Sequence, residues 1–123
     1  MNWIATIACN GYEMTDHAVR SFCGQDSGNA KICLLTNACD DNRMLAMQED
    51  LTRIDRWYRI ESIPYSVSHA WNVLIRETLR IGADHVLVCN NDIELHPATY
   101  RLLLADGGDF VTPMGMDRDW ETL

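Results

Sequence analysis

The feature that most constrains the fold is a regular alternation of short apolar runs with amphipathic segments. Apolar, β-rich runs at residues 3–9, 31–37, 57–63, 85–89 and 109–112 predict strands, and three of them are almost unbroken in apolar character. Such runs are typical of strands that are buried on both faces of a parallel sheet. The order β-α-β-α-β-α-β-α-β therefore predicts an α/β fold with a parallel-dominated sheet sandwiched by helices, because right-handed crossovers place helices on both faces.

Amphipathic segments between these runs predict four helices. They cover residues 15–23, 42–54, the segment from Ser66 or Ser68 to Gly82, and residues 97–108. Thr15 is the expected N-cap of the first helix, and Pro97 suits the first position of the fourth. In the second helix, apolar side chains recur at steps of three and four residues as far as Ile54. Residues 1–123 are expected to form a single domain.

The charge balance narrows the classes of partner. The chain carries 18 acidic and 10 basic side chains, a formal net charge of −8. This excess of negative charge disfavours nucleic acids and anionic membrane surfaces, and a polyanionic ligand would need a bridging cation. No apolar stretch approaches the roughly 18 residues that span a bilayer, and the N-terminus lacks the pattern of a signal peptide. We therefore expect no membrane span and a cytoplasmic location.

The cysteines predict free thiols. There are five, an odd number, with no C-x-x-C spacing, and Cys9, Cys33 and Cys89 lie in apolar runs. This pattern favours small buried thiols over disulfides or a zinc site.

The strongest local signal for a binding site is the triplet Asn90-Asn91-Asp92, which follows the apolar run 86–89 directly. In parallel α/β sheets, ligands bind outside the carboxyl ends of the strands. A carboxylate at that edge is a hard oxygen ligand for Mg²⁺ or Mn²⁺, and such a cation neutralises the phosphates of a nucleotide. The alternative is that the three residues simply form a turn.

Residues 70–75 (AWNVLI) and 82–97 (GADHVLVCNNDIELHP) resemble the family 2 glycosyltransferases of the GT-A fold. The resemblance lies in an A-x-N helix segment, a GAD sequence before a hydrophobic strand, and an acidic triplet followed by a proline-led helix. It extends more loosely over residues 3–115 and corresponds to the donor-nucleotide half of such an enzyme. It implies a nucleotide-diphosphate sugar as ligand, Mn²⁺ or Mg²⁺ on Asp92, and a triplet shaped by Asn90 and Asn91.

The resemblance also implies donor-site residues at the other strand ends. Thr36 stands where the family carries an aspartate, and Asn37 matches directly, with an amide that can donate and accept toward a base. Asp41 has an alternative role as the cap of the helix from Asn42, and Asn72 is alternatively an exposed polar residue at a helix start. The implied nucleotide-sugar-binding residues away from the triplet are Cys9, Asn10, Thr36, Asn37, Asp41 and Asn72.

Two functions remain open from the sequence. One is a glycosyltransferase-like protein that binds a nucleotide-diphosphate sugar through a divalent metal and transfers the sugar to an acceptor hydroxyl. The other is a non-catalytic relative that keeps the fold and nucleotide binding. No catalytic base is assigned, because the family supplies it from an acceptor half that the resemblance does not reach. Unpaired edges at the runs 57–63 and 109–112 predict a homo-oligomer.

Overall fold

Four parallel strands form the centre of the fold. The computed structural model describes residues 1–26, 29–50, 52–109 and 111. Across the sheet the strand order is β3-β2-β1-β4, and every pairing is parallel. The predicted parallel α/β class is therefore confirmed. Among the described residues the strands are β1 (Asn2–Ala8), β2 (Ala30–Asn37), β3 (Arg56–Ile60) and β4 (His85–Asn90).

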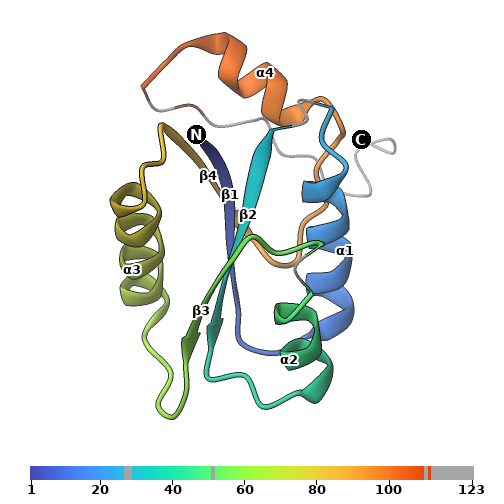
Figure 1. The fold of residues 1–123 in the computed structure, drawn as a ribbon, viewed down its shortest axis with the longest axis vertical. Helices are drawn as coiled ribbons and strands as arrows, with labels where there is room; N and C mark the ends of the chain where they lie inside the picture. The colour runs from blue at the N-terminus through green and yellow to red at the C-terminus, as the bar shows by residue number, and fades with distance from the viewer. Residues whose placement is uncertain (27–28, 51, 110, 112–123) are drawn as a thin grey trace, which may run out of the picture.

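Helices cover both faces of this sheet. In Figure 1, α1 and α2 lie on one face and α3 lies on the other, while α4 lies near the amino ends of the strands. The carboxyl ends of the strands are at the opposite end of the molecule from α4 (Figure 1). The bounds of the helices are α1 Tyr12–Cys23, α2 Asn42–Gln48, α3 Val67–Arg80 and α4 Thr99–Asp106.

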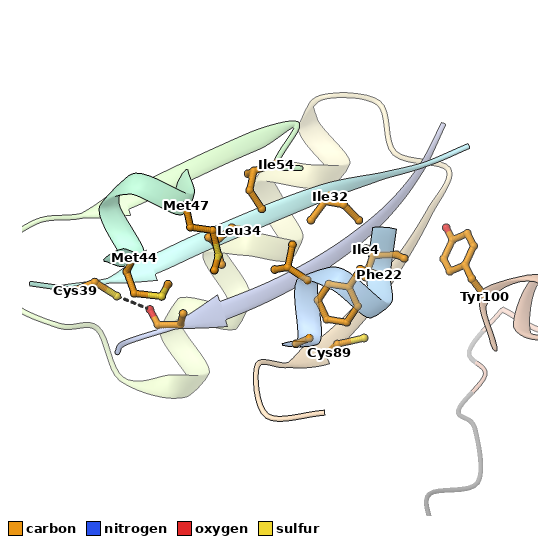
Figure 2. Close-up of a cluster of buried hydrophobic side chains, with 13 residues drawn as sticks. Ile4, Phe22, Ile32, Leu34, Cys39, Met44, Met47, Ile54, Cys89 and Tyr100 are labelled. Carbon is orange, nitrogen blue, oxygen red and sulfur yellow. Dashed lines mark hydrogen bonds between the residues drawn. The ribbon is translucent and has the colours of Figure 1, made fainter. Parts of the chain in front are cut away.

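The core has two apolar layers, one on each face of the sheet. Alternate residues of a strand face opposite sides, so Ile4 and Leu34 pack under α1 and α2, whereas Trp3 and Leu35 pack under α3. Figure 2 shows the first layer, in which Phe22 of α1 and Met44 of α2 lie over the even-numbered residues of β1 and β2. Burial on both faces explains why these two strands read as nearly unbroken apolar runs.

The first two helices differ from their predicted bounds. Thr15 is not an N-cap: α1 begins at Tyr12 after Gly11, and the buried Thr15 hydroxyl donates to the Gly11 carbonyl at 2.9 Å. The second helix ends at Gln48, and Ile54 reaches the same core layer from a turn. In that turn, Asp50 accepts hydrogen bonds from the backbone and hydroxyl of Thr52. The three- and four-residue spacing therefore continued beyond the helix.

The last predicted elements are also changed. The fourth helix begins at Thr99 and not at Pro97, and the His96 ring accepts a hydrogen bond from the Ala98 N–H ahead of it. In the predicted strand 109–112, Asp109 and Val111 are not in a strand, and residues 110 and 112 lie outside the described part of the chain. Within the described residues, no helix has the length and apolar character needed to cross a membrane.

The cysteine prediction is confirmed for two of the three residues in apolar runs. Cys33 and Cys89 are buried, and all five cysteines are free. Cys9 is exposed, because β1 ends at Ala8 and leaves it in the following loop.

Candidate functional site

The strand order creates a reversal point beside β1. The chain passes from β1 to β2 and then to β3 in one direction, and α3 returns it to β4 on the other side of β1. Ligands of such sheets bind at the carboxyl ends of the strands at this reversal. Seven of the predicted site residues lie at this edge, at or just after the ends of β1, β2 and β4: Cys9, Asn10, Thr36, Asn37, Asn90, Asn91 and Asp92.

The β4 triplet is fixed at its centre and exposed at its ends. The half-buried Asn91 donates from its amide nitrogen to the Thr15 hydroxyl at 3.0 Å, which ties the end of β4 to α1. Asn90 and Asp92 are exposed. The Asp92 carboxylate is therefore held at the protein surface by a well-anchored neighbour, and its binding of a metal stays a prediction.

The described residues supply too few ligands to hold a divalent cation alone, so a bound phosphate compound and water would have to supply the others. Within the described ranges, no group of three or more His, Cys, Asp or Glu side chains gathers to hold a metal ion. Mg²⁺ is commonly bound by one or two carboxylates, with substrate phosphates and water completing its shell. A single carboxylate at Asp92 suits a cation that arrives with a diphosphate.

The two predicted residues at the end of β2 are buried and are bonded to other parts of the protein. Thr36 is 1% exposed, and its hydroxyl accepts a hydrogen bond from the Trp57 indole at 2.8 Å. Asn37 is 7% exposed; its amide nitrogen donates to the Tyr65 carbonyl at 2.9 Å and its amide oxygen accepts from the Tyr65 N–H at 2.8 Å. Asn37 thus supports the loop before α3, and direct contact of either side chain with a nucleotide stays a prediction.

Asp41 has the capping role that the sequence left open. Its carboxylate accepts from the Arg43 N–H at 2.9 Å at the start of α2 and pairs with the Arg43 guanidinium at 3.2 Å. These hydrogen bonds from Arg43 hold the pKa of Asp41 below its usual value.

Arg43 links Asp41 to the first turn of α1. Its guanidinium pairs with the Glu13 carboxylate at 2.6 Å and lies 5.0 Å from the centre of the Tyr12 ring. A backbone hydrogen bond, followed by the bond from Arg43, lowers the pKa of Glu13. The residues predicted from the sequence did not include this cluster, although Tyr12 and Glu13 come only two and three residues after the predicted Asn10.

The turn after β2 is bound to both neighbouring strands. Ala38 has a left-handed φ of 56° and donates its N–H to the Ile60 carbonyl of β3 at 2.8 Å. The Cys39 thiol donates to the Ala8 carbonyl of β1 at 3.2 Å (Figure 2) and also to the Cys9 carbonyl. Burial raises the pKa of Cys39 to about 11, so the thiol keeps the proton that it donates.

Asn72 does not lie at a helix start. It is an exposed residue in the second turn of α3, whose N-cap is Ser66, a residue that accepts from the His69 N–H at 3.2 Å. The alternative of an exposed polar residue therefore describes its surroundings, and contact with a donor stays a prediction.

A hollow lies away from the carboxyl edge. It has a volume of about 320 Å³ and lies between β4 and α4, near the amino ends of the strands. It shares no residue with the predicted site, and its lining comprises Asp84, His85, Val86, Leu87, Tyr100, Leu103, Leu104, Gly107, Gly108, Asp109 and Val111.

Comparison with known proteins identifies the fold. No protein-family model and no curated protein matches the sequence. Among solved structures, S. aureus TarS 1–349 is similar, with a TM-score of 0.66 and 14% identity over 85% of this chain and 32% of that chain. The same TM-score and identity hold for TarS 1–349 in complex with UDP, of which 31% is covered, and for TarS, of which 19% is covered.

TarS is a glycosyltransferase, and at this identity the likeness concerns the fold alone. The expected glycosyltransferase-like α/β fold is therefore confirmed, while assignment to family 2 stays a prediction. The chain spans about a third of the TarS 1–349 chain.

Proposed function

We propose that this chain is a nucleotide-sugar-binding domain of a family 2-like glycosyltransferase. In this proposal a nucleotide-diphosphate sugar binds at the carboxyl edge of β1, β2 and β4, with Mn²⁺ or Mg²⁺ on Asp92. The observation that supports it best is the position of Asp92, two residues after the end of β4, the strand that pairs with β1 where the strand order reverses. The likeness of the fold to a protein solved with UDP adds support.

The charges at this edge explain why a cation is part of the proposal. When bound, a divalent cation supplies Lewis-acid stabilisation of a diphosphate leaving group. The protein itself carries a net charge of −8, and the Arg43 guanidinium is already shared between Asp41 and Glu13. Asp92 would hold the cation, and the bond from Asn91 to Thr15 would keep the triplet in position.

Transfer of the sugar to an acceptor hydroxyl is the proposed activity, and nucleotide binding without transfer is the alternative. We assign no catalytic base to any described residue. A cytoplasmic location and a homo-oligomer are also proposed; β3 and β4 are the edge strands of the described sheet, and an unpaired edge favours pairing with another chain.

Thermal unfolding with ligands tests the binding proposal. UDP, GDP and their hexose derivatives are added with and without Mn²⁺. A ligand at 100 times its dissociation constant stabilises the folded state by about 2.7 kcal/mol, which raises the melting temperature of a chain of this size by roughly 10 °C. We expect such a shift for one base, and only with Mn²⁺.

The Asp92→Asn variant should lose the Mn²⁺-dependent part of this shift, because an amide does not supply the anionic oxygen. Asp106→Asn is the matched control, since the exposed Asp106 is the last residue of α4, which lies near the amino ends of the strands, away from Asp92. An absence of stabilisation by every nucleotide would contradict the proposal. Stabilisation without sugar transfer or donor hydrolysis would favour the non-catalytic alternative.

A further inference from the structure

We propose that Tyr65 is a stacking surface for the nucleobase of the bound nucleotide and that Asn37 positions it. The inference rests on the proposed function, because it names the part of the same site that takes the base. Tyr65 lies in the loop between β3 and α3, and in Figure 1 this loop is at the same end of the molecule as the carboxyl end of β2.

The backbone of Tyr65 is held on both sides by one buried amide. Asn37 donates to the Tyr65 carbonyl at 2.9 Å and accepts from the Tyr65 N–H at 2.8 Å, and Asn37 itself is 7% exposed. The next residue, Ala38, bonds to the end of β3. The loop is therefore fixed to the edge of the sheet before any ligand arrives, which lowers the entropic cost of binding.

The ring of Tyr65 is supported but remains accessible. It lies 4.3 Å from the His69 ring, centroid to centroid, with the planes tilted by 58°. Its exposed fraction is 40%. A partly exposed aromatic ring that packs on a neighbouring ring suits the flat face of a base, and stacking of this kind does not require a positively charged side chain on this acidic protein.

The position of Tyr65 also agrees with the proposed phosphate end of the site. Tyr65 is bonded to the end of β2, and Asp92 follows β4, with β1 between these two strands. Neighbouring strands are about 4.8 Å apart, so the two strand ends are separated by roughly 10 Å. An extended nucleoside diphosphate can bridge such a separation, with its base at Tyr65 and its second phosphate at Asp92.

Calorimetric titration with UDP and with inorganic pyrophosphate, both in Mn²⁺, tests this inference. Tyr65→Ala should weaken UDP binding about 5- to 150-fold, the range typical for loss of a base–aromatic stack, and leave pyrophosphate binding within about twofold. Tyr65→Phe should retain UDP binding, because it keeps the ring. Val67→Ala, at a side chain that is 71% exposed and two residues further along, is the matched control and should not change it.

A double-mutant cycle tests the positioning role of Asn37. If Asn37 acts through Tyr65, then Asn37→Ala weakens UDP binding, and adding it to Tyr65→Ala causes no further loss. Unchanged UDP affinity in Tyr65→Ala, or an equal loss for UDP and pyrophosphate, would overturn the inference and leave the proposed function standing. Failure of the unaltered protein to bind UDP or any other nucleotide would overturn both.

Discussion

Replacement of Ala38 by glycine should stabilise the protein. Ala38 has a φ of 56°, the left-handed conformation that residues with a Cβ disfavour, and it lies in the turn after β2, where its N–H bonds to the Ile60 carbonyl at the end of β3. Strained backbone of this kind is concentrated at functional sites in proteins.

The size of the effect follows from three opposing contributions. The left-handed conformation costs about 1–2 kcal/mol for a residue with a Cβ, and glycine removes this cost. Glycine also loses about 0.5–1 kcal/mol more conformational entropy on folding than alanine. Loss of the half-buried methyl group removes a further few tenths of a kcal/mol of burial. The expected net gain in the free energy of unfolding is about 0.5 kcal/mol.

Urea unfolding, followed by the fluorescence of the four tryptophans, measures this gain. With a typical slope for a small domain, the midpoint should rise by about 0.3 M while the slope stays constant. Ala46→Gly is the matched control: Ala46 is exposed in the middle of α2, so glycine there should cost about 0.5–1 kcal/mol. If the two substitutions destabilise the protein equally, the left-handed conformation of Ala38 is not strained and the reasoning is wrong.

Three further predictions follow from the described contacts. When the native protein is treated with iodoacetamide, the exposed Cys9 and Cys23 should react first. The buried Cys33, Cys39 and Cys89 should be modified only after unfolding, because burial raises their pKa values to about 12, 11 and 12. Mass spectrometry checks the order, and early modification of a buried thiol would contradict it. Asp16→Asn should lower the free energy of unfolding by about 1–3 kcal/mol, because Asp16 is 8% exposed and its carboxylate pairs with Arg53 at 2.7 Å. Asp26→Asn, at the exposed pair with Arg101, should change the free energy of unfolding little. Hydrogen bonds from Arg43 lower the pKa of Asp41 in the folded state below its value of about 3.9 in the unfolded chain. The ionised carboxylate therefore stabilises the folded protein at pH values above about 3.9, and this contribution is lost as the pH falls through the lower pKa of the folded state. Asp41→Asn, which keeps a capping side chain, should therefore show a shallower loss of stability in acid, and an unchanged acid profile would refute this.

The sequence predicted the class and order of the elements well because both depend on apolar patterning. Strands β1 and β2 are buried on both faces, so their sequences are nearly unbroken apolar runs that predict strands directly. Boundaries were harder to predict. The spacing from Met44 to Ile54 continues past the end of α2 because a turn packs Ile54 against the same core layer.

That the predicted residues gather at one edge of the sheet could be inferred from the sequence, but their contacts could not. Parallel strands bring their carboxyl ends to one edge, so the ends of β1, β2 and β4 could be grouped from the sequence. The hydrogen-bond partners of Asn37 and Thr36 could not be predicted from the sequence, because Tyr65 and Trp57 lie 28 and 21 residues further along the chain. Asn72 was misplaced by one helical turn, since Ser66 caps α3.

Chemical-shift mapping with UDP and Mg²⁺ tests the central proposal most directly. Backbone amide signals are compared before and after addition of the nucleotide. We expect changes at the carboxyl edge, in residues 9–13, 36–41, 65, 66 and 90–92, and none in α4 at the other end of the sheet. Changes confined to the hollow between β4 and α4, or no changes at all, would contradict a nucleotide site at the carboxyl edge.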